Sequence, residues 1–224
     1  MNGLFLYLLI ILIPLIASAN IKKTYSKYSR VQNDKSLTGF DVARRILDAN
    51  GMNKMYIVEV PGELTDHYDP KQKVVRLSTD IYHNTSVASL AVAAHECGHA
   101  IQDNTGYTMM KIRSKLCPVV NFITYSAYIL FAISAILQAF SYLKIAAISV
   151  LAGLLFQIVT LPVEFNASNR ALKQIEELGL VSKEEKKSAY KVLKAAALTY
   201  VAAVLSSLIN LLRIVMSISS NDRR

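Results

Sequence analysis

The stretch PVVNFITYSAYILFAISAILQAF, residues 118–140, decides the class of fold, because its 23 residues include no charged side chain. A helix of that length rises about 35 Å, which is enough to cross the ~30 Å hydrocarbon core of a bilayer with some tilt. Further apolar runs cover residues 3–19, 145–162 and 195–212. The sequence therefore predicts a mainly α-helical integral membrane protein with about four transmembrane helices.

The first apolar run ends in Ala17-Ser18-Ala19, a pattern of small residues that is typical of signal-peptidase sites. Two features favour an uncleaved membrane anchor over residues 1–19 instead. No lysine or arginine precedes the run, and a basic cluster from Lys22 to Arg30 follows it directly. Because basic residues beside an apolar run stay on the cytoplasmic side, we expect the N-terminus to lie outside the cell.

The basic residues also predict the topology of the rest of the chain. Of the 25 lysines and arginines, 14 lie in residues 20–117 and 7 in residues 163–194. Both segments should therefore be cytoplasmic, joined by a two-helix membrane hairpin over residues 118–162. Residues 163–194 are expected to form a cytoplasmic helix. Residues 195–224 then form a C-terminal membrane helix and tail. The basic ending NDRR fits a complete crossing poorly, so a re-entrant or interfacial segment is the alternative there.

The net charge of +9 comes mostly from basic residues in the segments expected on the cytoplasmic side of the membrane. There these residues attract anionic lipid headgroups. The lipid bilayer is thus an expected partner of the chain. No basic segment is interleaved with aromatic residues in the manner of a nucleic-acid-binding surface, so a nucleic-acid partner is not expected. The charge is a signal of topology rather than of a soluble ligand.

Residues 20–117 are long enough for a small domain, and their patterns predict its elements. Residues 38–51 carry apolar side chains on one helical face. Residues 55–62 and 73–79 are short β-branched runs bounded by turn residues, and they predict two strands. Residues 87–103 form an apolar helical segment. The sequence therefore predicts a small α+β domain that ends in a helix.

That last helix contains the sequence AVAAHECGHAIQD, residues 91–103. His95 and His99 are four residues apart, so they lie one turn apart on the same helix face. Neutral imidazoles are good ligands for Zn²⁺. Glu96 is rotated about 100° from His95, so it can reach the water on the metal rather than the metal itself. This H-E-x-x-H arrangement predicts one zinc ion per chain, with Glu96 as the catalytic base.

A hydrolytic zinc site needs a third protein ligand, and the residues alone leave several candidates open. Glu164 is favoured because it follows 18 uncharged residues and should lie at the membrane surface, where an unpaired carboxylate is costly. Alternatively, Pro162 opens a helix there and Glu164 is an acid in its first turn, favoured by the helix dipole. The other candidates expected on the same side of the membrane are His67, Asp69, His83 and Asp103.

Three sequence blocks resemble a known family, and they are DHYDPKQKVVRLS (66–78), VAAHECGHAIQ (92–102) and FQIVTLPVEFNASNRA (156–171). In these blocks the chain resembles the bacterial YugP-like membrane zinc metallopeptidases. More distantly it is similar to the gluzincins of the HtpX and CAAX prenyl protease type. The resemblance implies a multi-pass protein of the bacterial inner (plasma) membrane, with a zincin-like domain and its active site on the cytoplasmic face. It also implies Glu164 as the third zinc ligand.

Two positions depart from the pattern of these relatives. Ser168 stands where the distant relatives have an aspartate, and Asn166 stands where the closer family usually has one. Groups in such places orient the metal ligands and tune their basicity. The implied mechanism also needs a donor for the oxyanion, for which His67 and Tyr68 are the candidates.

The predicted function is a membrane-embedded zinc endopeptidase that cleaves membrane-proximal or unfolded segments of peptide or membrane-protein substrates. Residues 73–78 are either an edge strand that aligns an extended substrate or a core strand. The alternative function is a catalytically inactive, zinc-binding membrane scaffold, against which Glu96 argues because a structural zinc site needs no general base. Cleavage specificity and oligomeric state are not encoded in these patterns.

Overall fold

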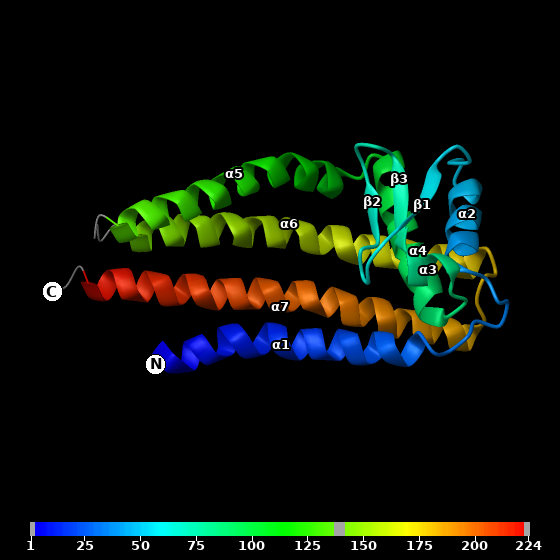
Figure 1. The fold of residues 1–224 in the computed structure, drawn as a ribbon, viewed down its shortest axis with the longest axis horizontal. Coiled ribbons are helices and arrows are strands. Elements are labelled where there is room, and N and C mark those ends of the chain that lie inside the picture. The colour runs from blue at the N-terminus through cyan, green and yellow to red at the C-terminus, as the bar shows by residue number, and fades with distance from the viewer. Residues whose placement is uncertain (1–2, 137–141, 222–224) are drawn as a thin grey trace. The chain divides into compact units, whose positions relative to one another are not determined.

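The computed structural model describes residues 3–136 and 142–221 of the chain (Figure 1). These ranges are mainly helical, as the sequence predicts, and they contain one small sheet. In chain order the elements are α1 (Gly3–Tyr28), α2 (Gly39–Ala49), β1 (Tyr56–Val60), β2 (His67–Asp69), β3 (Val74–Ser78), α3 (Thr79–His83), α4 (Val87–Asn104), α5 (Thr108–Ile136), α6 (Tyr142–Glu177) and α7 (Lys183–Asn221).

The chain divides into two compact units. The helical unit comprises Met1–Ser18, Lys111–Pro162 and Leu198–Arg224, and the mixed unit comprises Ala19–Met110 and Val163–Ala197. Helices α1, α5, α6 and α7 each contribute to both units without a break. The predicted segment boundaries at residues 19, 117, 162 and 194 therefore fall inside continuous helices.

Among the residues that the structure describes, three helices are long and apolar enough to cross a membrane, and their candidate spans are Leu4–Tyr28, Lys144–Glu177 and Lys183–Ser219. This finding supports a membrane protein, whereas the predicted count of four spans is not confirmed. The run at residues 118–140 is helical in α5 as far as Ile136. Its last residues, 137–140, lie outside the described part of the chain, as does most of the NDRR ending.

The expectation that Pro162 opens a helix is wrong, because α6 continues through Pro162 to Glu177. Residues 163–194 accordingly do not form a helix of their own, since α7 begins only at Lys183. A proline inside a helix removes one backbone hydrogen bond. Membrane helices tolerate this loss because neighbouring groups satisfy the freed carbonyl.

Within the helical unit, a proline in α1 illustrates how such a carbonyl is satisfied. Pro14 has no N–H to donate to the carbonyl of Ile10, four residues earlier. The hydroxyl of Ser206 on α7 donates to that carbonyl at 2.7 Å. The Arg213 guanidinium also lies 5.7 Å from the centre of the Tyr7 ring. Helices α1 and α7 are therefore joined by polar contacts.

The mixed unit contains a three-stranded sheet with the order β1-β3-β2. Strand β1 is parallel to β3, and β2 is antiparallel to it. The prediction of two strands is wrong by one, because β2 spans only three residues in a stretch that resembles a turn-rich connection. The edge-strand alternative for residues 73–78 is wrong too, since β3 is paired on both sides.

The core of the mixed unit lies between this sheet and helices α2, α3 and α4. Its fully buried side chains include Val75 and Leu77 from β3, Ile46 from α2, Ile81 from α3 and Leu90 from α4. Ser86 caps α4, because its side chain accepts a hydrogen bond from the Ser89 backbone N–H at 3.0 Å. This packing fixes the helix that contains both motif histidines.

Candidate metal centre

Helices α4 and α6 approach each other closely at Gly98, which lies between the two motif histidines. A β-carbon at Gly98 would lie 2.4 Å from the carbonyl oxygen of Ala167, so no other residue fits without a shift of the backbone. Side chains that flank this point, one from each helix, are therefore within reach of one another.

The close approach brings together His95, His99 and Glu164. The Oε2 atom of Glu164 lies 3.3 Å from Nε2 of His95 and 3.6 Å from Nε2 of His99. The imidazole rings are nearly perpendicular, at 83°, with their centres 4.8 Å apart. One potential ligand atom from each residue lies within 4.8 Å of the others, and no second group of this kind occurs in the described ranges.

These three groups fit a catalytic zinc ion in both chemistry and spacing. Two imidazole nitrogens and one carboxylate oxygen are a known donor set for catalytic zinc, with bonds of about 2.0–2.2 Å. Ligand atoms at that distance from a tetrahedral ion lie roughly 3.4 Å apart, close to the separations between Glu164 and the histidines. Of the other predicted third ligands, none is brought into this group.

The centre is largely shielded from solvent. The side chains of His95, His99 and Glu164 are 16%, 9% and 3% exposed. Burial alone would lower the pKa of His99, but its hydrogen bond to Glu164 and the negative charges of Glu96 and Glu164 outweigh burial and raise that pKa above its ordinary value. The site therefore favours positive charge, as a cation site should.

The remaining nitrogen of each imidazole contacts a second polar residue. Nδ1 of His95 lies 3.2 Å from Oγ of Ser168, and Nδ1 of His99 lies 3.0 Å from Oε1 of Gln102. Both Nε2 atoms are thereby left facing Glu164. Sequence reasoning singled out Ser168 but missed Gln102, although its place one turn after His99 was a usable signal.

A protein family described as "Putative neutral zinc metallopeptidase" matches residues 4–219 of the chain. The chain belongs to this family. It is also 45% identical over 200 residues to "Putative membrane protease YugP" of Bacillus subtilis (strain 168), and the match covers 89% of each protein. No solved structure matches the chain. The resemblance inferred from the three sequence blocks is confirmed, and the family supports a zinc-dependent protease role in a membrane protein.

In this member of the metallopeptidase family, the other predicted third ligands make contacts elsewhere. These contacts join His67 Nδ1 with the Thr65 carbonyl at 2.7 Å, Asp69 with the backbone N–H groups of Lys71 and Gln72, and His83 with Glu59 at 3.1 Å. His67 and His83 are exposed. Their positions explain why only Glu164 joins the histidines.

Asp103 and Tyr68, two further candidates, contact each other. The Tyr68 hydroxyl donates to Oδ2 of Asp103 at 2.7 Å, and Lys73 pairs with the same oxygen. Burial and the neighbouring Asp103 raise the pKa of Tyr68 far above its ordinary value. Tyr68 therefore remains a hydrogen-bond donor, and the structure aims it at Asp103.

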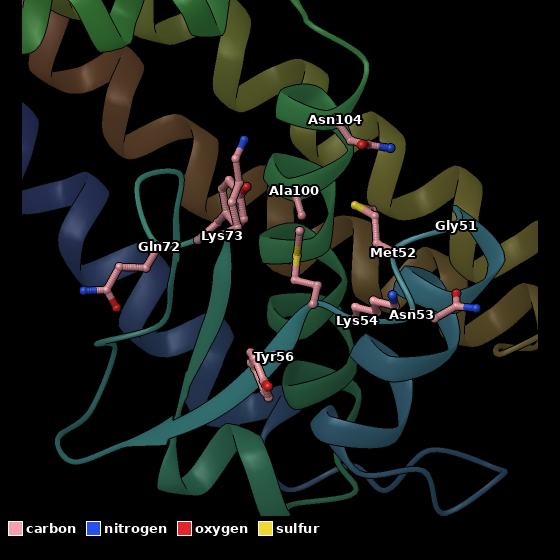
Figure 2. Close-up of a pocket in the computed structure, with 11 residues that line it drawn as sticks. Gly51, Met52, Asn53, Lys54, Tyr56, Gln72, Lys73, Ala100 and Asn104 are labelled. Atoms are coloured by element: carbon pink, nitrogen blue, oxygen red, sulfur yellow. The ribbon is translucent and has the colours of Figure 1, made fainter.

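A pocket of about 560 Å³ lies beside the C-terminal half of α4, between the loop after α2 and the turn between β2 and β3 (Figure 2). Helix α4 contributes Ala100 and Asn104 to its lining. None of His95, Glu96, His99 or Glu164 lines it. The pocket is therefore not part of the candidate metal centre of this metallopeptidase-family chain.

Proposed function

We propose that the protein is a membrane-embedded zinc endopeptidase that hydrolyses peptide bonds in membrane-proximal or unfolded protein segments. The observation that carries the proposal is the convergence of the two Nε2 atoms and the Glu164 carboxylate within 4.8 Å. Membership in a zinc metallopeptidase family supports the same reaction class.

In this mechanism, His95, His99 and Glu164 hold one zinc ion. When bound, the ion acts as a Lewis acid and lowers the pKa of its water towards ~7. Glu96 follows His95 on α4, is only 8% exposed, and makes no hydrogen bond or ion pair within the described ranges. Its carboxylate is thus available to accept the proton of the attacking water and to deliver it to the leaving amine.

His67 and Tyr68 stay proposed contacts for the oxyanion or the substrate. Both residues lie on β2, an outer strand of the sheet. Tyr68 is a donor of the right kind, but its hydroxyl must first leave Asp103. If a bound substrate displaces Asp103, the Tyr68 hydroxyl becomes free to donate to the oxyanion. This part of the site would then form only in the presence of substrate.

The proposed substrates and location follow from where the ligands lie on the chain. Glu164 is on α6, whose residues Lys144–Glu177 are a candidate span. A site on such a helix suits substrates at or near the bilayer surface. Because basic residues concentrate in segments 20–117 and 163–194, we assign the centre to the cytoplasmic face of the bacterial inner membrane.

A cleavage assay tests the proposal. The full chain, purified in detergent and loaded with zinc, is incubated with unfolded casein and with a reconstituted single-span membrane protein. We expect zinc-dependent cleavage that falls by a factor of about 10² to 10⁴ in Glu96→Gln, since that is the usual contribution of a general base. Glu63→Gln, at an exposed loop position, should leave the rate unchanged.

Two results would contradict the proposal. Cleavage that persists in Glu96→Gln would assign the activity to another residue or to a contaminating protease. A zinc-loaded wild-type chain that cleaves neither substrate, and that leaves the same cellular phenotype as Glu96→Gln, would indicate the inactive scaffold.

A further inference from the structure

Gln102 connects the candidate metal centre to α6 through a chain of hydrogen bonds. Its side chain is completely buried. Its Oε1 atom lies 3.0 Å from Nδ1 of His99. Its Nε2 atom lies 2.7 Å from the carbonyl oxygen of Val163 and 3.1 Å from Oδ1 of Asn166. The Nε atom of Arg170 lies 2.8 Å from the same Oδ1 atom.

The groups at the far end of this chain of hydrogen bonds determine which atom donates in each bond. A backbone carbonyl such as that of Val163 only accepts hydrogen bonds, and the Arg170 guanidinium only donates them. Asn166 must therefore present its oxygen to Arg170 and to Gln102. Gln102 must in turn direct its NH₂ group at Val163 and Asn166, which leaves its oxygen facing His99.

This direction assigns the proton on the His99 ring. Because the oxygen of Gln102 only accepts, its contact with His99 requires hydrogen on Nδ1 of the ring. The Glu164 carboxylate also accepts, and while no metal is bound it competes for the hydrogen at Nε2. With hydrogen on Nδ1 alone, the lone pair lies on Nε2, the nitrogen 3.6 Å from the Glu164 carboxylate. That is the nitrogen a metal would bind.

His95 has no comparable constraint. Its Nδ1 atom faces the hydroxyl of Ser168 at 3.2 Å. A hydroxyl both donates and accepts, and its hydrogen rotates. This contact is therefore compatible with either tautomer of His95, so the two motif histidines differ in how firmly their protons are placed.

We propose that Gln102, held in place by Asn166 and Arg170, is a positioning residue that keeps His99 in the tautomer required to bind zinc. The inference rests on the zinc site proposed above. Outer partners of metal-binding histidines typically contribute roughly 10- to 100-fold to metal affinity or activity. The inference also accounts for Asn166, because an amide oxygen accepts from both neighbours as an aspartate would.

Zinc affinity of the full chain in detergent, measured by competition with a chelator, tests the proposal. We expect roughly 10- to 100-fold weaker binding in Gln102→Met and in Asn166→Leu, which keep the approximate size of each side chain. Asn166→Asp should keep the wild-type affinity, because an oxygen acceptor remains. Gln174→Met is the matched control, since Gln174 accepts a hydrogen bond from Asn50, the residue after α2, and takes no part in the hydrogen bonds that connect His99 to Arg170.

The tautomer itself gives a readout that does not depend on hydrolysis. The protein has only 4 histidines, so ¹⁵N-histidine labelling gives a spectrum with few signals, and His99→Ala identifies that of His99. In the Glu164→Ala variant no Glu164 carboxylate competes at Nε2. At about pH 9, where imidazoles of ordinary pKa (about 6.5) are neutral, this metal-free variant should have hydrogen on Nδ1 of His99. Adding Gln102→Met to it should give a mixture of both tautomers.

Hydrogen on Nε2 of His99 in the Glu164→Ala variant, where Gln102 is the remaining partner of the ring, would overturn the inference. So would a Gln102→Met variant with unchanged tautomer and unchanged zinc affinity. If no form of the chain binds zinc, the proposed function fails, whereas the tautomer measurement still decides the role of Gln102. Asn166→Leu acts through the same hydrogen-bond chain, and it keeps the test decisive if Gln102→Met does not fold.

Discussion

The protonation of His99, one of the three ligand candidates, depends on its surroundings. Burial opposes its positive charge, yet the hydrogen bond to Glu164 and the charge of Glu96 prevail and raise its pKa. A ligand histidine must be neutral to bind zinc. The residues that attract the metal therefore also attract the competing proton.

This competition predicts how zinc affinity depends on pH. His99 loses a proton on binding zinc, so affinity should be full above its raised pKa and should fall as pH drops through that value. The decline should begin at a higher pH than for an imidazole of ordinary pKa, about 6.5. Below it, each pH unit should weaken binding by about tenfold for each proton displaced.

Chelator competition over a pH series measures this effect, with calorimetry in two buffers to count the released protons. Glu96→Gln provides the comparison, since it removes a negative charge that raises the pKa of His99 but leaves all three proposed ligands in place. An affinity that stays constant down to about pH 6 would contradict the account, because even an unperturbed imidazole protonates near there.

At the residue scale, the sequence predicts the proposed metal ligands better than it predicts the residues that hydrogen-bond to them. His95, Glu96 and His99 are recognisable from spacing alone, because four residues make about one helical turn. Glu164 is only favoured by its place after an uncharged run. The place of Gln102 one turn after His99 can be read from the sequence, but its contacts with the Val163 carbonyl and with Asn166 depend on the fold.

At the scale of elements, the approach of α4 to α6 places the ligands. Gly98 permits that approach, since a β-carbon there would lie 2.4 Å from the Ala167 carbonyl oxygen. Gly98→Ala should push the helices apart and separate both histidines from Glu164. Because a misplaced ligand loses most of its bond, we expect at least tenfold weaker zinc binding, the lower end of the usual effect of disturbed ligand orientation.

Zinc titration of Gly98→Ala, with circular dichroism to check the fold, measures this effect. Gly153→Ala is a matched control, because it is also a helical glycine and its added β-carbon meets no atom within 4 Å. Equal zinc affinity in the two variants would mean that the close approach of α4 and α6 does not position the ligands.

The elements that sequence reasoning missed are short or interrupted. Strand β2 has three residues and α3 has five, too few for a periodic pattern to be read. Helix α6 continues through Pro162, a residue that usually ends or opens a helix in soluble proteins. The longer elements α2, β1 and β3 lie within the predicted segments, and α4 extends one residue beyond its segment, to Asn104. Their apolar periodicity extends over one or more full turns or pleats.

At the scale of the whole molecule, a proline and a serine connect the first and last helices of the helical unit. Ser206 donates to the Ile10 carbonyl that Pro14 leaves without a partner. Ser206→Ala should therefore lower the free energy of unfolding by about 0.6–1.7 kcal/mol, the range for hydrogen bonds between membrane helices.

Unfolding in detergent by denaturant measures this change, with Ser207→Ala as the neighbouring control. The variant Pro14→Ala provides a sharper check, because an alanine restores an N–H that bonds the Ile10 carbonyl within α1. In a Pro14→Ala background, Ser206→Ala should cost little. An equal cost in both backgrounds would show that Ser206 stabilises the helices in some other way.

The sequence predicts a membrane protein because it contains several long uncharged runs, each of which is a candidate transmembrane helix. The number of spans does not follow as simply. Three helices qualify by length and composition within the described ranges, and residues 137–140 of the predicted span at 118–140 fall outside them. Length and hydropathy thus predict a membrane protein, whereas the number of spans depends on how far each helix continues past its apolar run.

The central claim is that His95, His99 and Glu164 bind one zinc ion together, and elemental analysis of purified protein tests it most directly. We expect about one zinc per chain in the wild type and in Glu96→Gln, since Glu96 is not a ligand. His99→Ala and Glu164→Ala should each retain little or none. A wild type without zinc from a zinc-replete preparation, or a Glu164→Ala variant that keeps its zinc, would contradict the account.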